Sequence, residues 1–162
     1  MFKKKLISSV FLALGILAFD QFTKYLVLKG MRLYQSIHII DHILSITYIR
    51  NPNSVFGISF GGKFPYPVMI LILVVAVLIL WTVENKPTFY LLYSAIIGGA
   101  LGNLIDRLRF KEVIDFIDVG LGKNLRWPVF NVADASISIS VVLLLYFSLK
   151  SARVKRDEIT TD

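Results

Sequence analysis

The chain has 162 residues, of which 56% are hydrophobic, and its formal net charge is +7. Soluble globular domains average roughly 45–50% apolar residues, so this composition and the mean hydropathy of +0.68 favour an integral membrane protein. The absence of cysteine excludes a disulfide, a zinc–thiolate site and a thiol nucleophile within the chain. The basic residues cluster beside apolar runs, where they meet lipid headgroups. We therefore expect membrane lipid as a partner and no nucleic acid.

The N-terminal stretch "MFKKKLISSVFLALGILAF" is built like a secretory signal, with basic residues followed by an apolar core. The apolar run continues past Asp20 to Leu28, and no motif of small residues for cleavage closes it. We therefore expect this segment to be a retained membrane anchor.

Four stretches are apolar and long enough, or nearly so, to cross a hydrocarbon core, which needs ~20 residues. They cover about residues 6–28, 67–83, 89–105 and 132–149. Only "ENKPT" separates the second stretch from the third, which indicates a tight helical hairpin, and Pro87 suits the start of the third helix. We predict a single integral membrane domain over residues 1–162, of the all-α class with four transmembrane helices.

An even number of spans places both termini on one side of the membrane. Basic residues are dense in both tails, at Lys3, Lys4, Lys5, Lys150, Arg153, Lys155 and Arg156. This predicts cytoplasmic termini and two long loops on the outer side. The first loop contains "IHIIDHILSITYIRN", whose Ile, Thr and Tyr content and partial alternation predict short strands. From about residues 31–66 we expect a small β-rich element on the outer membrane surface.

Polar residues inside spans are costly and mark function or pairing. Asp20 and Lys24 lie four residues apart on one helix face, either as a pair that fixes the end of the first span or with a direct role. Asn103, Asp106 and Arg107 share a face of the third span. The small residues that precede them, at a spacing that favours close helix packing, are Gly98, Gly99 and Gly102.

Two further segments carry carboxylates beside apolar residues. In "EVIDFIDVG", Asp115 and Asp118 are three residues apart, so in a strand they point to opposite faces. In "FNVADAS", Asn131 suits the N-cap of the fourth helix and Asp134 its first turn. Capping explains one carboxylate at a helix start, but it does not explain why so many polar residues gather at one membrane level.

Two carboxylates in one polar pocket can carry out acid–base hydrolysis. Held close together they cannot both ionise, so the ionised one activates water and the protonated one donates to the substrate. A zinc site at "HIIDH" fits less well, because a metalloprotease motif needs Glu directly after the first His and Ile39 stands there. A transporter or proton-relay subunit remains an alternative, since Asp20, Lys24, Asp106 and Arg107 are intramembrane ionisable residues.

Five blocks in order resemble the signature blocks of the lipoprotein signal peptidase family, also called signal peptidase II. They are "FDQFTKY" (19–25), "YIRNPNSVFGI" (48–58), "GGALGNLIDR" (98–107), "VIDFID" (113–118) and "FNVADASI" (130–137). The resemblance implies an aspartic endopeptidase of the bacterial inner membrane with its site near the outer face. It would cut diacylglyceryl-modified prolipoproteins before the lipidated cysteine, without a cofactor or metal.

On the matching positions, the family's catalytic pair falls on Asp115 and Asp134. Its substrate-binding or supporting positions fall on Asp20, Lys24, Asn51, Asn103, Arg107 and Asn131. The resemblance also implies an outer β-cradle and inhibition by globomycin-type cyclic peptides. We expect a monomer, because no partner subunit is implied.

The chain departs from the family pattern at Asn53, Ser54 and Val55, where the family usually has glycine and two alanines. We expect this difference to affect the fit of substrate or inhibitor more than the chemistry, because Asn51 and Phe56 match. A catalytically inactive homologue that binds lipoproteins is the remaining alternative.

Overall fold

The computed structural model describes residues 2–52, 66–122 and 125–161, with side chains described as far as residue 153. These residues form four long helices, α1 (Phe2–Gly30), α2 (Tyr66–Val83), α3 (Pro87–Phe110) and α4 (Val132–Thr161). They also form four strands in one antiparallel sheet, β1 (Ser36–Ile40), β2 (Leu44–Asn51), β3 (Val113–Leu121) and β4 (Leu125–Arg126). The chain order is α1-β1-β2-α2-α3-β3-β4-α4.

Each of the four helices is long and apolar enough to cross a membrane. Even α2, with 18 residues, extends about 27 Å at 1.5 Å per residue, close to the ~30 Å of a hydrocarbon core. Large apolar side chains such as Phe11, Ile72 and Val142 are exposed on the outside of the helices, as expected for surfaces that face lipid. The prediction of four transmembrane helices with a small sheet is therefore confirmed, and each predicted span lies inside one helix.

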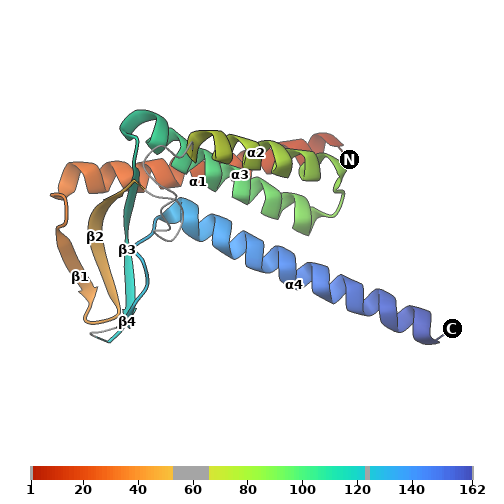
Figure 1. The fold of residues 1–162 in the computed structure, drawn as a ribbon. Coiled ribbons are helices and arrows are strands. Elements are labelled where there is room, and N and C mark those ends of the chain that lie inside the picture. Colours follow the sequence, from red (N-terminus) through yellow and green to blue (C-terminus); the bar gives the residue numbers. More distant parts are fainter. Residues whose placement is uncertain (1, 53–65, 123–124, 162) are drawn as a thin grey trace.

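Helix α3 packs against each of the other three helices, and α4 diverges from the bundle towards its C-terminal end (Figure 1). Glycines make the close approaches possible. A Cβ at Gly98 would lie 2.6 Å from the backbone oxygen of Ala13 in α1, and one at Gly99 would lie 2.7 Å from that of Ala133 in α4. The small residues of α3 therefore act in helix packing, as their spacing predicted.

The sheet lies at the end of the bundle opposite both chain termini (Figure 1). Strands β1 and β2, the short strands predicted in the first long loop, pair as an antiparallel hairpin, and β2 pairs with β3 from the second loop, which places Ile49 opposite Asp115. A buried cluster of Val27, Tyr48, Ile114 and Phe116 joins the sheet to the end of α1. This packing fixes the position of β3, and therefore of Asp115, relative to the helices.

Three helices extend beyond the predicted spans: α1 covers Phe2–Gly30, α3 ends at Phe110 and α4 ends at Thr161. Helix α3 runs five residues past the predicted end of its span, so Asp106 and Arg107 lie in the helix, on the face that they were expected to share with Asn103. The helix ends where Lys111 adopts a left-handed conformation (φ 64°) and its N–H bonds to the Arg107 carbonyl. The start of α3 agrees with the sequence, since Pro87 lies in its first turn.

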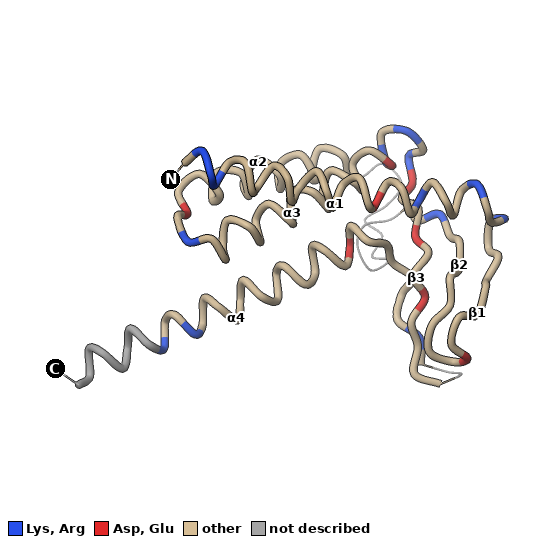
Figure 2. Tube along the Cα trace, turned by 180° about the vertical axis from the view of Figure 1, so that it is seen from behind, with Lys and Arg blue, Asp and Glu red and all other residues tan. Residues whose placement is uncertain are grey.

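Charged residues are concentrated at the two ends of the helices, and the middle of each helix carries none (Figure 2). At the end away from the sheet, the buried Lys5 ammonium lies 2.5 Å from the carbonyl oxygens of Trp81 and Glu84 at the C-terminus of α2. A cation there complements the partial negative charge of the helix end. At the other end, acidic residues gather where α1, α3, β3 and the start of α4 meet.

Candidate functional site

Asp115 lies on β3 with its carboxylate directed towards the helices, and its side chain is buried (1% exposed). Its two oxygens accept hydrogen bonds from different elements: Oδ2 from the Asn51 amide at the end of β2 (2.9 Å) and Oδ1 from the Asn131 amide (2.7 Å). Burial, followed by the nearby charge of Asp134, raises the pKa of Asp115 to about 7. Asp115 is therefore poised to gain and lose a proton near neutral pH.

Asp134 lies in the first turn of α4, three residues after Asn131, which caps the helix. The backbone N–H of Asp134 bonds to Asn131 Oδ1 at 2.9 Å, which is the N-cap geometry that the sequence predicted. Asp134 Oδ1 accepts a hydrogen bond of 2.8 Å from the Asn103 amide on α3. Asn131 thus contacts both aspartates, through its NH₂ group to Asp115 and through its oxygen to the Asp134 backbone.

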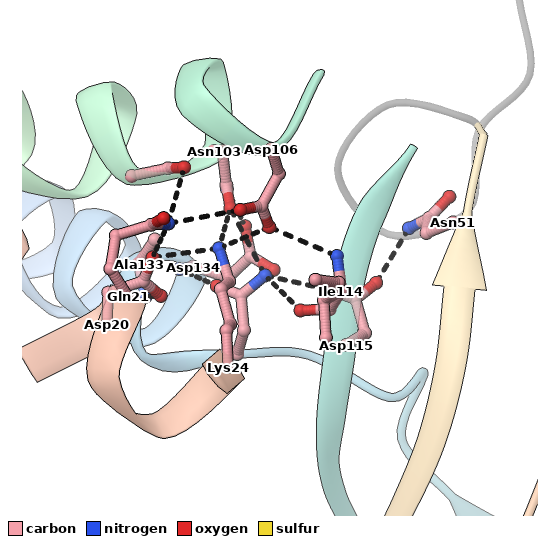
Figure 3. Close-up of polar contacts among 12 residues, drawn as sticks. Asp20, Gln21, Lys24, Asn51, Asn103, Asp106, Ile114, Asp115, Ala133 and Asp134 are labelled. Carbon is pink, nitrogen blue, oxygen red and sulfur yellow. Dashed lines mark hydrogen bonds and ion pairs between the residues drawn. The ribbon is translucent and has the colours of Figure 1, made fainter. Parts of the chain in front are cut away.

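A buried ionic cluster lies behind the two aspartates (Figure 3). The Lys24 ammonium forms ion pairs with Asp20 at 2.8 Å and Asp106 at 2.9 Å. It also donates to Asn103 Oδ1 at 2.9 Å. The Gln21 amide donates to Asp106 Oδ1 at 3.0 Å. Helices α1 and α3 are therefore joined by polar contacts at the level of the site.

Arg107 on α3 is also buried, and its guanidinium carbon lies 4.8 Å from the centre of the Tyr66 ring at the start of α2. This distance is typical of a cation–π contact. The guanidinium interacts electrostatically with Asp115, Asp134 and Asp106. Arg107 therefore supplies positive charge to the site, as its place beside Asn103 and Asp106 on the helix face suggested.

Asp118 belongs to a separate group of contacts. It accepts hydrogen bonds from Thr47 Oγ1 (2.8 Å) and from Arg126 Nε (2.8 Å), so it joins β2 and β3 to β4. Its partners differ from those of Asp115, in agreement with the strand argument that residues three apart point to opposite faces. Asp118 is therefore a cross-strand contact of the sheet.

A cavity of about 300 Å³ opens beside Asp134, between the start of α4 and the segment that leads into it. It is lined by Trp127, Phe130, Asp134, Ala135, Ser138 and Ile139. Its walls are mostly apolar, and the Asp134 carboxylate is the charged group in its lining. Within the part of the chain that the structure describes, no group of three or more His, Asp or Glu side chains is arranged to hold a metal ion.

The structure brings all eight residues that were singled out from the sequence to one end of the bundle. Asn51, Asn103, Asp115, Asn131 and Asp134 form one connected set of hydrogen bonds, and Asp20, Lys24 and Arg107 border it. The unusual triplet Asn53, Ser54 and Val55 lies outside the described residues, as does Phe56.

Two residues of the site were not selected as site residues from the sequence. Asp106 was noted only for its place on the helix face and as a possible relay group. Gln21 lies between Asp20 and Lys24 and donates to Asp106 and to the Gly102 carbonyl. Its position three residues before Lys24 on the same helix was the available signal.

Known proteins resemble this chain along most of its length. A family model described as signal peptidase (SPase) II matches residues 12–150. A lipoprotein signal peptidase of Thermodesulfovibrio yellowstonii is 43% identical over 143 residues, which cover 88% of this chain and 92% of the relative. Those of Syntrophus aciditrophicus (35% over 160 residues; 94% and 99% covered) and Staphylococcus aureus (36% over 154 residues; 93% of each) are similar.

Two solved structures, each described as a bacterial membrane enzyme, share the fold. One has a TM-score of 0.81 and 34% identity, with 89% of this chain and 88% of the other covered. The second has a TM-score of 0.77 and 34% identity, with 88% and 92% covered. Together with the match over residues 12–150, these similarities show that the chain belongs to the signal peptidase II family, the lipoprotein signal peptidases.

Proposed function

We propose that this protein is an aspartic endopeptidase that removes the signal peptide from diacylglyceryl-modified prolipoproteins by cutting before the lipidated cysteine. Membership of the family supports a protease that acts on prolipoproteins. The observation that carries the aspartic mechanism is the pairing of Asp115 and Asp134 around Asn131, with one carboxylate on a strand and the other at a helix start.

The two carboxylates divide the proton transfers of hydrolysis between them. Since two carboxylates close together in a site shielded from water cannot both ionise, we infer that the dyad holds one proton near neutral pH. The ionised carboxylate takes a proton from water as the water oxygen attacks the scissile carbonyl. The protonated carboxylate donates to the carbonyl oxygen, and a proton then passes to the leaving nitrogen as the C–N bond breaks. The products are the signal peptide, with a new carboxyl end, and the lipoprotein, with a free cysteine amine.

The neighbouring residues suit this mechanism. Asn51 and Asn131 donate to the Asp115 carboxylate, and Asn103 donates to Asp134. Arg107 supplies positive charge beside both, where it can stabilise the oxyanion that develops on the substrate carbonyl. The cavity beside Asp134 offers an apolar substrate segment a place next to that carboxylate.

The position of the site also suits a lipidated substrate. It lies at the ends of the helices beside the sheet, where headgroups and water meet the hydrocarbon core. The diacyl chains can stay in lipid while the scissile bond reaches the dyad. We place both termini in the cytoplasm and the site at the outer face of the bacterial inner membrane. Inhibition by globomycin-type peptides and a monomeric state remain predictions from the family.

The test is cleavage of a diacylglyceryl-modified prolipoprotein by purified protein in detergent or lipid, with a metal chelator present throughout. The wild type is compared with Asp115→Asn and Asp134→Asn. Asp118→Asn is the matched control, since Asp118 lies on the same strand but contacts Thr47 and Arg126. We expect the first two variants to lose cleavage and the control to retain it.

The same assay distinguishes the alternatives. Unchanged cleavage by Asp115→Asn or Asp134→Asn would remove that residue from the dyad. Wild-type protein that binds the prolipoprotein but never cuts it would identify a binding homologue. The structure disfavours the alternative of a transporter with a proton relay. The ionisable groups that would carry the proton, Asp20, Lys24 and Asp106, are held in ion pairs with one another.

A further inference from the structure

Lys24 is surrounded by protein oxygens. Its ammonium lies 2.8 Å from Asp20 Oδ2, 2.9 Å from Asp106 Oδ2 and 2.9 Å from Asn103 Oδ1. An ammonium has three N–H donors, so these contacts use all of them, and the side chain is only 2% exposed. The Lys24 ammonium therefore holds the neighbouring side chains in place and has no donor left to bind a substrate.

The two carboxylates that bind Lys24 also bind the backbone next to the two proposed catalytic residues (Figure 3). Asp20 Oδ1 accepts the N–H of Ala133 at 2.9 Å, directly before Asp134. Asp106 Oδ2 accepts the N–H of Ile114 at 3.2 Å, directly before Asp115. A continuous series of contacts therefore runs from the backbone of one aspartate, through Lys24, to the backbone of the other.

The third contact of Lys24 reaches a catalytic side chain directly. Because the ammonium donates to Asn103 Oδ1, the NH₂ group of that amide must face the other way, where it donates to Asp134 at 2.8 Å. Asn131 also donates to Asn103 Oδ1, at the longer distance of 3.2 Å. Without the ammonium, the Asn103 amide loses its shorter contact and can rotate to turn its oxygen towards Asp134.

Resting on the proposed function above, we propose that Lys24 is a positioning residue that sets the separation of Asp115 and Asp134 and the orientation of the Asn103 amide. Three helices and one strand meet at this single ammonium through Asp20, Asp106 and Asn103. A displacement of either backbone segment changes the spacing of the two carboxylates. Misplacement of reacting groups by about 1 Å can lower a rate by about 100-fold.

The proposal predicts a shift in pH dependence as well as a loss of rate. The charged or titratable side chains that face the dyad are Asp20 and Lys24 from α1, Tyr66 from α2, and Asp106 and Arg107 from α3. Removing the Lys24 charge makes ionisation of the dyad harder, and a wider spacing weakens the shared hydrogen bond that stabilises the singly ionised dyad. Both effects move the acidic limb of the pH–rate profile to higher pH.

The experiment compares Lys24→Met with Lys5→Met in the full-length protein. Lys5 is the matched control, because it is also a buried lysine of α1 that binds protein oxygens, but those are carbonyls of α2 at the far end of the bundle. Thermal unfolding, kcat, KM and the pH profile are measured with the diacylglyceryl-modified prolipoprotein. For Lys24→Met we expect kcat at least ~100-fold lower with KM within about threefold, and an acidic limb raised by at least about half a pH unit.

Lys5→Met is expected to lower the unfolding temperature while kcat per folded molecule and the pH profile stay unchanged. If Lys24→Met behaves in the same way, its role is only structural and the proposal is wrong. Should Lys24→Met fail to fold, the double variant Asp20→Asn/Lys24→Met keeps the net charge of the cluster and an acceptor for the Ala133 N–H. Low kcat in this folded variant supports the proposal, and wild-type kcat overturns it.

The two proposals fail in different ways. If Asp115→Asn and Asp134→Asn remain active, the proposed dyad is wrong whatever the Lys24 variants show. If those two variants are inactive while Lys24→Met, or the double variant, keeps the wild-type kcat and pH profile, only the positioning role of Lys24 is wrong.

Discussion

The Asn131 side-chain amide donates a hydrogen bond of 2.7 Å to Asp115 Oδ1, which joins the start of α4 to strand β3. The oxygen of the same amide caps α4 by accepting the Asp134 N–H at 2.9 Å. One planar group therefore links the Asp115 carboxylate to the Asp134 backbone: its NH₂ group binds the carboxylate and its oxygen caps the helix. The two tasks can be separated by substitution.

Asn131→Asp is expected to keep the helix cap and disturb the dyad. Asp is as good an N-cap as Asn, but it replaces the amide donor with a third carboxylate, beside Asp115 and Asp134. We expect the cap to persist but the unfolding free energy to fall, because the new carboxylate is buried against Asp115, and we expect cleavage at pH 7 to be lower by about 100-fold or more. Asn131→Ala should lose both tasks. Equal activity of wild type and Asn131→Asp at pH 7 would contradict the assigned contact.

The sequence predicted much of the helical part because its signals are local. Twenty or so apolar residues in a row can cross a membrane only as a helix or in a barrel, and Asn131 lies three residues before Asp134, the spacing of an N-cap. The short strands of the first long loop were predicted from β-branched residues with partial alternation. These inferences use residues close together in the chain, where spacing translates directly into geometry.

Contacts between residues far apart in the chain could not be predicted from sequence spacing. Asp106 accepts a hydrogen bond from the Ile114 N–H and forms an ion pair with Lys24. Asp20 accepts a hydrogen bond from the N–H of Ala133, which lies 113 residues away. Nothing in the spacing of these residues indicates which backbone N–H each carboxylate will meet. The end of α3 was also placed five residues too early, at residue 105, although Asp106 and Arg107 were expected on the same helix face as Asn103. Their burial depends on Lys24 and Tyr66, which come from other helices.

The raised pKa of Asp115 predicts how activity depends on pH. Burial and the charge of Asp134 raise this pKa to about 7, so above about pH 7 the dyad loses its single proton. In the proposed mechanism, the acid that donates to the substrate carbonyl is then missing. We expect kcat/KM for the prolipoprotein to fall as the pH rises from 7 to 9, measured in one buffer series at constant ionic strength. A profile that stays flat to pH 9 would exclude Asp115 as the proton carrier.

The same pKa predicts how stability depends on pH. The ordinary pKa is 3.8 and the folded value is about 7, so the folded state binds the Asp115 proton more tightly. The stability due to this proton is fully present below about pH 4 and is lost as the pH rises through 7. Asp115→Asn removes this loss, so its stability relative to wild type should increase by a few kcal/mol between pH 4 and pH 8.

The measurement for this effect is thermal unfolding of wild type and Asp115→Asn at both pH values in the same detergent. Asp41→Asn, in the exposed turn between β1 and β2, shows what an acid-to-amide change does at the surface. A difference between wild type and Asp115→Asn that is the same at pH 4 and pH 8 would contradict the raised pKa.

Glycines of α1 and α3 give a final prediction, because similar substitutions meet different surroundings. A Cβ at Gly99 would lie 2.7 Å from the backbone oxygen of Ala133, the residue before Asp134. A Cβ at Gly98 would lie 2.6 Å from the Ala13 oxygen, on the side of α1, and one at Gly15 would meet nothing within 4 Å. Backbone contacts this short force the helices apart.

We therefore expect Gly98→Ala and Gly99→Ala each to cost about 1–3 kcal/mol in stability, but only Gly99→Ala to lower kcat per folded molecule, because it moves the start of α4. Gly15→Ala should be neutral or stabilise by up to ~1 kcal/mol through helix propensity. Thermal unfolding and cleavage rates of the three variants test this order. Equal kcat in Gly98→Ala and Gly99→Ala would mean that the packing of α3 against Ala133 does not control the position of Asp134.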